Sequence, residues 1–441
     1  MSLPTPPTVR KLQETLHAKA KGSPGYRFYA LYDKVYRRDV LEVAFGRCRA
    51  NGGAPGIDGQ TFDDIQAYGV ERWLDELASD LRSKTYQPQP VRRVYLPKPD
   101  GTRRPLGIGT IRDRVTQMAV VLILEPIFET DLPPEQHAYR PERSALDAVR
   151  QVHGLLSSGH TEVVDADLSG YFDTIPHHEL MKSVSRRVSD RHHLKLIKMW
   201  LEAPVEEIDD RGRRHRTTRN RDEGRGTPQG SPLSPLLANI YMRRFVLGWK
   251  VLGHEARLDA HIVNYADDFV ICCRGTADEA MRVMRSMMSK LKLTVNEAKT
   301  RLCRVPEESV NFLGYTIGLC HSAQTGRSYI GTRPSAKKIA ALKAEIHELT
   351  SRRWLWTTVE DRVVKLNRKL RGWSNYFCLG PVSPAYRAID RHARHRLRQW
   401  LRGKHKLQSR GTSRFPDARL HDEVGLMRLC DRPRSFPWAQ A

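Results

Sequence analysis

The chain has 441 residues, with 74 Lys and Arg against 50 Asp and Glu, so its formal net charge is +24. This charge draws polyanions and favours a nucleic-acid partner. No apolar run of 18 residues is present and the N-terminus has no apolar signal core, so neither a transmembrane helix nor a membrane partner is expected. The seven cysteines form no C-x-x-C pair, so neither a zinc ribbon nor a disulfide framework is indicated, and a reducing cytoplasm fits.

The first candidate functional element is a pair of extended runs on either side of the turn signal Asp100-Gly101. Pro97, Pro99 and Pro105 keep these runs from being helical. The pattern predicts a stiff two-stranded finger that carries Lys98 and Arg104 and folds over a triphosphate. Arg103 could exchange roles with Arg104, and an ordinary solvated hairpin is the alternative.

Carboxylates follow two further predicted strands. The β-branched stretch 161–168 ends near Asp167, and the apolar hairpin 261–272 carries Asp267 and Asp268 at its tip. Two adjacent carboxylates resist joint ionisation unless a cation lies beside them, although Asp is also a common turn residue. Three carboxylates from two strands make an oxygen site suited to Mg²⁺. Two such ions, about 3.5–4 Å apart, clamp the attacking and leaving oxygens of a phosphoryl displacement.

These considerations make Asp167, Asp267 and Asp268 the candidate catalytic residues, and the predicted metal ligands are the same three together with Leu168. Asp165 would share a sheet face with Asp167 but lies further from the turn, and Asp173 lies past the turn, so both rank lower.

The middle of the chain contains two loops. Residues 206–226 are polar and Arg-rich, which predicts a long mobile or nucleic-acid-contacting loop. Gln229 lies in a Gly- and Pro-rich loop that leads into an apolar helix over 232–241. Such a loop brings the backbone close to a nucleotide, to which Gln229 can donate and from which it can accept hydrogen bonds. A plain helix-entry loop is the alternative.

The last quarter of the chain is strongly basic: residues 331–441 hold 25 Lys and Arg against 9 Asp and Glu. Apolar residues at helical spacing after Ser335, a candidate N-cap, predict a helix over 335–350. Aromatic residues alternate with the basic ones and offer rings that could stack on bases. Beyond Lys404 the periodicity is weak, so residues 404–441 are expected to form a basic tail, either DNA-binding or partly disordered.

Over about residues 45–400 the chain resembles group II intron reverse transcriptases/maturases. The stretches that carry this resemblance are 51–59 (NGGAPGIDG), 96–108 (LPKPDGTRRPLGI), 140–145 (RPERSA), 226–235 (GTPQGSPLSP), 265–268 (YADD) and 366–377 (LNRKLRGWSNYF), in the family's order. The resemblance implies an α+β right-hand polymerase with an antiparallel palm sheet, fingers and a helical thumb. The implied organisation is a helical extension over 1–44, fingers and palm over 45–325, and a thumb or maturase domain over 326–403.

The resemblance also implies roles for individual residues. Phe172 would favour deoxynucleotides by clashing with a 2′-hydroxyl, although a plain core role is the alternative. Lys299 would neutralise or protonate the leaving pyrophosphate, although a solvated surface Lys is the alternative. The hairpin Phe312, Leu313, Gly314 and Tyr315 would be a primer grip. The residues expected to bind RNA are Arg368, Lys369, Arg371, Trp373 and Tyr376.

The expected function is RNA-directed DNA synthesis with two Mg²⁺ ions, combined with binding and splicing of group II intron RNA. The expected partners are that RNA, an RNA template with a DNA primer, dNTPs and target DNA, in a bacterial, nucleoid-associated cytoplasmic setting. No cysteine pairs follow the maturase motif, so no target-cleaving nuclease domain is expected. Two alternatives are an RNA-binding splicing cofactor without polymerase activity and a domesticated reverse transcriptase in defence or repair. No pattern indicates an oligomeric state.

Overall fold

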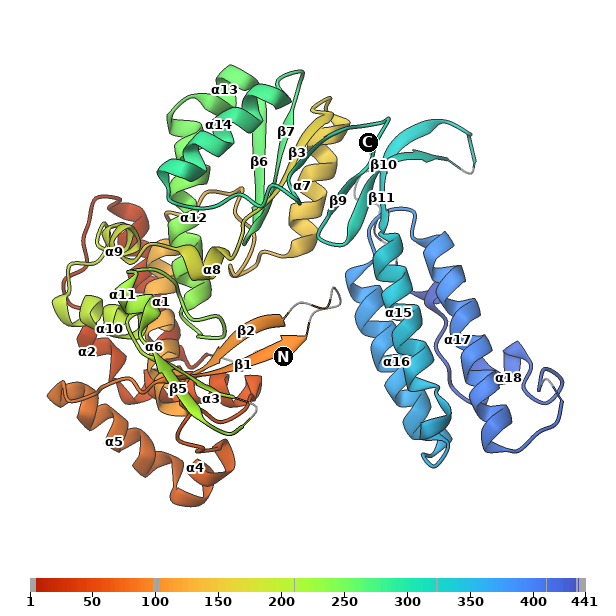
Figure 1. Cartoon of the computed structure of the whole chain (residues 1–441), viewed down its shortest axis with the longest axis horizontal. Helices are drawn as coiled ribbons and strands as arrows, with labels where there is room; N and C mark the ends of the chain where they lie inside the picture. Colours follow the sequence, from red (N-terminus) through yellow and green to blue (C-terminus); the bar gives the residue numbers. More distant parts are fainter. Residues whose placement is uncertain are drawn as a thin grey trace.

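The computed structural model describes residues 5–97, 101, 103–209, 211–322, 324–409, 411–433 and 435. Figure 1 shows an N-terminal region of helices with a small sheet, a central sheet, and a C-terminal bundle of long helices that stands to one side. Within the described residues, no helix combines the length and the apolar character that crossing a bilayer requires.

The N-terminal region is built around a helix that is buried on nearly all sides. Its helices are α1 (Pro7–Gly22), α2 (Tyr32–Val35), α3 (Arg38–Asn51), α4 (Phe62–Tyr68), α5 (Val70–Ser83) and the central α6 (Ile111–Glu129). Thr110 caps α6 by accepting a hydrogen bond from the backbone N–H of Asp113. Because α1 and α3 pack on α6, and α3 runs through residue 44, the described residues 5–44 are part of this core. The structure therefore shows no boundary at the predicted division between residues 44 and 45.

Four strands form a sheet at the edge of this region, in the order β2-β1-β4-β5. The strands β1 (Val91–Pro97) and β2 (Arg103–Ile108) form the predicted antiparallel hairpin, with Pro97 opposite Arg103. Its predicted nucleotide ligand Lys98 lies outside the described residues.

The segment 206–226 was predicted to be a long mobile or nucleic-acid-contacting loop, but it contains paired strands, β4 (Val205–Ile208) and β5 (Arg214–Thr217). Val205 pairs in parallel with Val91, more than a hundred residues away, and this partner is invisible to a local pattern. The short helix α11 (Arg219–Asp222) follows β5.

The central sheet has the order β6-β7-β3-β8, and all its neighbouring strands are antiparallel. The strands are β3 (Glu162–Asp167), β6 (Ala260–Tyr265), β7 (Asp268–Cys273) and β8 (Arg301–Arg304). Successive side chains alternate between two cores: Val163 and Val270 face α7 (Ala145–Ser157), whereas Val164 and Ile271 join the core that contains α12 (Ser234–Val251) and α14 (Ala277–Lys290). The helices α8 (Tyr171–Thr174), α9 (His177–Val184), α10 (Arg191–Leu201) and α13 (His254–Leu258) complete this part of the chain.

A three-stranded sheet joins the central sheet to the C-terminal bundle (Figure 1). It consists of β9 (Val310–Phe312), β10 (Tyr315–His321) and β11 (Ser328–Pro334). The predicted division between residues 325 and 326 would cut the β10–β11 hairpin, so the structural division lies after Pro334. The predicted helix over 335–350 is confirmed as α15 (Ala336–Leu349), and Ser335 is its N-cap.

The bundle comprises α15, α16 (Val359–Tyr376) and α17 (Ser383–Lys404), with the short helical turn η1 (Arg352–Trp354). The segment expected to be a tail packs against it through α18 (Asp417–Asp422) and η2 (Leu429–Asp431). The Asp390 carboxylate accepts hydrogen bonds from the backbone N–H groups of Leu429 and Cys430. The described part of residues 404–441 is thus an integral part of the bundle, which corrects the tail prediction.

Candidate active site

The three predicted catalytic carboxylates come together at one end of the central sheet. Asp167 is the last residue of β3 and pairs directly with Asp268, the first residue of β7. Asp267 lies in the two-residue turn between β6 and β7, beside Ala266, whose φ of 59° is left-handed. Antiparallel pairing therefore produces the predicted cluster, because it places the end of one strand beside the beginning of the next.

A buried asparagine that sequence reasoning missed fixes the shape of this turn. Asn264 is fully buried, and its side-chain amide donates a 2.9 Å hydrogen bond to the carbonyl oxygen of Ala266. Its backbone carbonyl accepts from the N–H of His137 at 3.0 Å, which joins the β6 edge to the segment before α7. The only sequence signal was a polar residue inside an otherwise apolar strand.

A second loop holds Asp167 from the other side. Lys299 lies with its Nζ 2.9 Å from Asp167 Oδ2, and the side-chain amide of Asn296 donates to the same oxygen at 3.2 Å. The backbone N–H of Asn296 also donates to the Asp167 carbonyl at 2.8 Å. Lys299 thus contacts one of the predicted catalytic carboxylates, whereas the resemblance implied a role at the leaving pyrophosphate. Asn296 is a further residue that the predictions missed.

The carboxylates repel one another strongly. Withdrawal from water and the nearby charges of Asp267, Asp167 and Asp165 raise the pKa of Asp268 to about 7, although part of its side chain is open to solvent. Burial and the charge of Asp167 also raise the pKa of Asp267. Asp165 is paired with Arg301, whose Nε lies 3.2 Å from its Oδ2.

This electrostatic state fits a divalent cation. Ionising Asp268 at neutral pH is unfavourable by itself, and a bound cation would relieve the repulsion while using oxygen ligands of the kind that hard cations prefer. Asp167, Asp267 and Asp268 present such oxygens, and the backbone of Leu168 follows at once. The donor set therefore agrees with the predicted metal site.

The glycine-rich loop 226–230 packs against the segment that follows Asp167. The backbone N–H of Thr227 donates to the carbonyl oxygen of Phe172 at 2.7 Å, and Gln229 Nε2 donates to Asp173 Oδ2 at 3.1 Å. On its other side, the Gln229 carbonyl accepts from the N–H of Gly107 in β2, at 2.6 Å. The loop therefore connects the β1–β2 hairpin to the neighbourhood of the carboxylates, and it brings the predicted nucleotide-binding residues Phe172 and Gln229 together.

Arg104 and Tyr139, a residue that the predictions missed, also lie beside the carboxylates. Arg104 is exposed and interacts electrostatically with both Asp267 and Tyr139. The ring of Tyr139 packs edge-on against Phe172, with centroids 6.4 Å apart, and Tyr139 has a left-handed φ of 57°. Partial burial and the Asp267 charge raise the pKa of Tyr139. An exposed aromatic residue in a strained conformation beside the carboxylates is characteristic of a functional position.

The predicted primer grip is a tight β9–β10 hairpin, as expected. Its two central residues, Leu313 and Gly314, have φ values of 50° and 84°, which is the pattern of a type I′ turn. Phe312 and Tyr315 are buried, so a contact with a ligand would have to come from the backbone of the turn.

One of the predicted RNA-binding residues fastens this hairpin to the bundle, and a second packs beside it. The Tyr376 hydroxyl donates to the Leu313 carbonyl at 2.7 Å. The Trp373 ring packs 4.6 Å from that of Phe377, whose ring lies 5.1 Å from that of Tyr315 in the hairpin. The side chains of Trp373 and Tyr376 are half-buried, and a packing role accounts for them. Arg368, Lys369 and Arg371 in α16 are exposed, and Lys369 pairs with Glu345 at 2.9 Å.

Comparison with known proteins agrees with this geometry. Residues 96–317 match the reverse transcriptase (RNA-dependent DNA polymerase) family, and residues 339–415 match the group II intron maturase-specific domain. The chain is 33% identical over 367 residues to protein YkfC of Escherichia coli, an alignment that covers 75% of the chain and 93% of that relative.

Two other relatives are longer than this chain. The chain is 29% identical over 363 residues to the group II intron-encoded protein LtrA of Lactococcus lactis, covering 68% of the chain and 58% of LtrA. It is 28% identical over 334 residues to the putative COX1/OXI3 intron 1 protein of Saccharomyces cerevisiae, covering 64% of the chain and 38% of that protein. The chain thus spans little more than half of LtrA.

Proposed function

This chain belongs to the family of group II intron reverse transcriptases and maturases, and we propose that it copies RNA into DNA and assists the splicing of an intron RNA. The observation that carries the proposal is the meeting of Asp167, Asp267 and Asp268 at one end of an antiparallel sheet, inside the segment that matches reverse transcriptases. RNA-directed DNA polymerases are the enzyme class to which this segment belongs.

The proposed layout is that of a right hand. The β1–β2 hairpin and its supporting helices would be the fingers, the central sheet the palm, and α15–α17 the thumb and maturase domain. The hydrogen bond from the Gly107 N–H to the Gln229 carbonyl supports this arrangement, because it couples the proposed fingers to a loop of the proposed palm.

The metal ions in the proposal are two Mg²⁺, held by Asp167, Asp267 and Asp268 and by the carbonyl of Leu168. When bound, they would lower the pKa of the primer 3′-hydroxyl and neutralise the charge of the triphosphate. Asn296 and Lys299 would keep the Asp167 carboxylate oriented, since both contact its Oδ2. The contact of Lys299 leaves its ammonium group close enough to the carboxylates to balance negative charge on the leaving pyrophosphate.

The remaining nucleotide contacts follow from the fingers and the glycine-rich loop. Arg104, with Lys98, would bind the triphosphate, because Arg104 is exposed beside Asp267 and a guanidinium can hold phosphate oxygens with two parallel hydrogen bonds. Phe172 would lie under the sugar and reject a 2′-hydroxyl, since Tyr139 restricts the motion of its ring. Gln229 would hydrogen-bond the nucleotide or the template.

The RNA-binding part of the proposal rests on the bundle. Arg368, Lys369 and Arg371 are exposed on α16, within the segment that matches the maturase-specific domain. Basic side chains on one helix can track a phosphate backbone, and their binding weakens as salt rises.

The raised pKa of Asp268 predicts a pH-dependent metal requirement. Below pH 7 a cation must displace a proton from this carboxyl, and above pH 7 it need not. We expect the Mg²⁺ concentration for half-maximal DNA synthesis to fall severalfold from pH 6 to pH 8 and then to level off. Without metal, the neutral Asp268 carboxyl favours the folded state, so the fold should lose stability as pH rises from the ordinary carboxyl range to about 7. Because the pKa of Asp267 is raised as well, the Asp268→Asn variant should show a smaller loss than the wild type in thermal denaturation, and an identical pH profile in variant and wild type would contradict the assignment.

The activity itself is tested by extension of a DNA primer on an RNA template with Mg²⁺, using dNTPs in one reaction and NTPs in another. We expect extension with dNTPs and little with NTPs, because of Phe172. Tight RNA binding without any incorporation of dNTPs would contradict the polymerase proposal and leave an RNA-binding splicing cofactor.

A further inference from the structure

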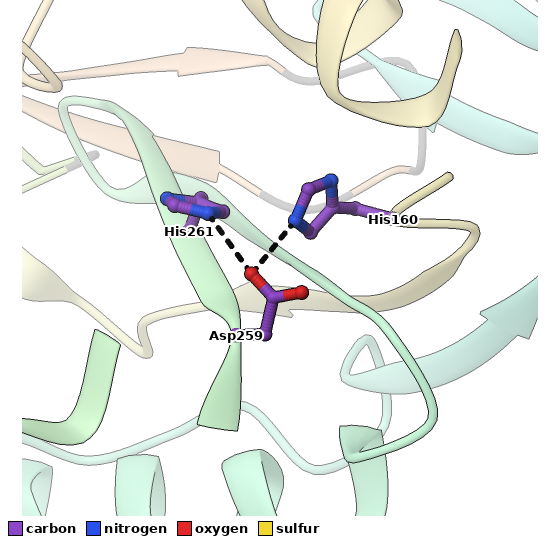
Figure 2. Close-up of side chains that lie close together, drawn as sticks. All are labelled: His160, Asp259 and His261. Carbon is purple, nitrogen blue, oxygen red and sulfur yellow. Dashed lines mark hydrogen bonds and ion pairs between the residues drawn. The ribbon is translucent and has the colours of Figure 1, made fainter. Parts of the chain in front are cut away.

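A second group of possible metal ligands lies away from the catalytic carboxylates. Each of His160, Asp259 and His261 offers one ligand atom, and these three atoms lie within 4.8 Å of one another. Figure 2 shows both imidazole rings turned toward the same carboxylate oxygen. His160 Nε2 lies 3.1 Å from Asp259 Oδ1, and His261 Nε2 lies 3.6 Å from that same atom.

The sheet register explains how residues a hundred positions apart come together. Ala260 in β6 pairs with Cys273 in β7, and Cys273 pairs with Glu162 in β3. Asp259 and His160 therefore lie just beyond the same end of the sheet, with His261 one residue inside it. This end is opposite to the end that carries Asp167 and Asp268, so the group is remote from the catalytic carboxylates.

The hydrogen bonds around His160 are compatible with a cation at Nε2. The Ser158 hydroxyl lies 2.8 Å from the carbonyl oxygen of Leu155, to which it can donate its single proton. Its oxygen, 3.0 Å from His160 Nδ1, can then accept a hydrogen bond from the Nδ1–H tautomer of the ring. In that tautomer the lone pair of Nε2 faces the Asp259 carboxylate, and a cation between these two atoms would bind both.

His261 and the second oxygen of the Asp259 carboxylate each have a further contact on the side away from the proposed site. His261 Nδ1 faces Glu255 Oε1 at 3.8 Å, so its outer nitrogen also points at an acceptor while Nε2 points inward. Arg274 Nε lies 3.6 Å from Asp259 Oδ2, which orients the carboxylate and leaves Oδ1 for the imidazoles. Outer acceptors of this kind orient histidines that bind metals.

We propose that His160, Asp259 and His261 bind one Zn²⁺ ion. Two imidazole nitrogens and one carboxylate oxygen suit zinc, and the exposure of Asp259, about half of its side chain, leaves the fourth position to water. The ion would tie the segment before β3 to the turn between α13 and β6. Its effect would be on the stability of the palm-like sheet, because the site is at the far end of the strands from the reacting groups.

The test uses the full chain after removal of metal by a chelator, in excess Mg²⁺ so that the catalytic carboxylates are occupied. Bound Zn²⁺ is measured by equilibrium dialysis, and the melting temperature is measured with and without Zn²⁺. We expect one Zn²⁺ per chain and a rise in melting temperature of about 2 °C or more, because a ligand that binds only the folded state stabilises it. Absence of Zn²⁺ binding by the wild type would overturn the proposal. A rise in melting temperature that lowering the pH reproduces without Zn²⁺ would also overturn it.

Two conservative variants remove ligands without altering the fold. Asp259 has a left-handed φ of 42°, which Asn tolerates well, so Asp259→Asn keeps the turn. His261→Gln changes a partly exposed side chain on the edge strand β6. Each variant should weaken Zn²⁺ binding at least tenfold and leave primer extension in Mg²⁺ unchanged. Undiminished stoichiometric binding in both variants would overturn the proposal.

The matched control is His215→Gln. His215 Nε2 lies 3.2 Å from Asp209 Oδ2, so it forms a comparable histidine–carboxylate pair elsewhere in the protein. Zn²⁺ binding should be unchanged in this control, and a loss equal to that of His261→Gln would contradict the assigned site.

Chemical modification of histidines in the wild-type protein tests the site without any variant. His261 is partly exposed, so it should react with diethyl pyrocarbonate, and mass spectrometry can locate the modified residue. Zn²⁺ should protect His261 from this reaction and leave His215 reactive. Equal protection of both residues, or of neither, would overturn the proposal.

Discussion

Replacing Asp267 and Asp268 together by alanine is expected to lower RNA-templated DNA synthesis by at least about 10³-fold while leaving RNA binding within about twofold of the wild type. The loss follows because the variant keeps only Asp167 of the three carboxylates that would hold the metal ions. RNA binding should persist because the exposed cations of α16 lie in the separate C-terminal bundle. Primer extension and a filter-binding titration measure the two quantities.

The chain supplies a matched control for this double variant. Asp63 and Asp64 are another adjacent pair, at the start of α4, and Asp64 accepts hydrogen bonds from Thr61 in a capping box. Replacing both by alanine changes the net charge by the same amount and costs about 1 kcal/mol of helix capping. DNA synthesis should remain near the wild-type rate in this control. Parallel losses of synthesis and RNA binding in the Asp267 and Asp268 variant would contradict separate sites.

The substitution Gly230→Ala is expected to lower DNA synthesis by about 10²-fold with the overall fold retained. Gly230 has a φ of 106°, and a Cβ there would lie 2.6 Å from the Gly107 carbonyl oxygen and 2.9 Å from Leu106 Cδ1. The loop would have to move away from β2, breaking the hydrogen bond between the Gly107 N–H and the Gln229 carbonyl and displacing the Gln229 side chain. Steady-state primer extension measures the loss of rate, and circular dichroism checks the fold.

The variant Gly253→Ala is a control that separates the effect of the steric clash in Gly230→Ala from the effect of backbone strain. Gly253 also has a positive φ, of 74°, but nothing lies within 4 Å of a Cβ built there, and it is between α12 and α13. This control should lose about 1 kcal/mol of stability and keep its DNA synthesis. Comparable synthesis by the Gly230 and Gly253 variants would show that contact between the loop and β2 is unimportant.

The features that could be predicted from the sequence are local ones. The hairpin that carries Asp267 and Asp268 follows from apolar runs on either side of a polar turn, and the start of α15 follows from Ser335 before helical spacing. The finger hairpin follows from its prolines and the Asp100-Gly101 turn. Each of these patterns is formed by residues that are close together in the sequence. Tertiary contacts therefore did not have to be known to predict them.

The predictions that needed correction concern segments whose partners are distant. The strand β4 is formed by pairing with β1, and the described part of the chain after residue 404 packs against α16 and α17. The resemblance implied an extension over residues 1–44, but the apolar residues described there pack on partners distant in the sequence, such as α6 and Val188. A polar or weakly periodic segment is ordered whenever it buries its few apolar side chains on a surface formed elsewhere.

The sequence by itself determined the chemistry of this protein: which carboxylates could bind metal, which loop could approach a nucleotide, and where the positive charge is concentrated. Only the tertiary structure decided how those groups meet. It placed Asn264, Asn296 and Tyr139 around the carboxylates, paired Lys299 with Asp167, and buried Phe312 and Tyr315. It also brought His160 and Asp259 to one end of a sheet, although 99 positions separate them. Strand register and core packing decide such contacts, and neither leaves a local pattern in the chain.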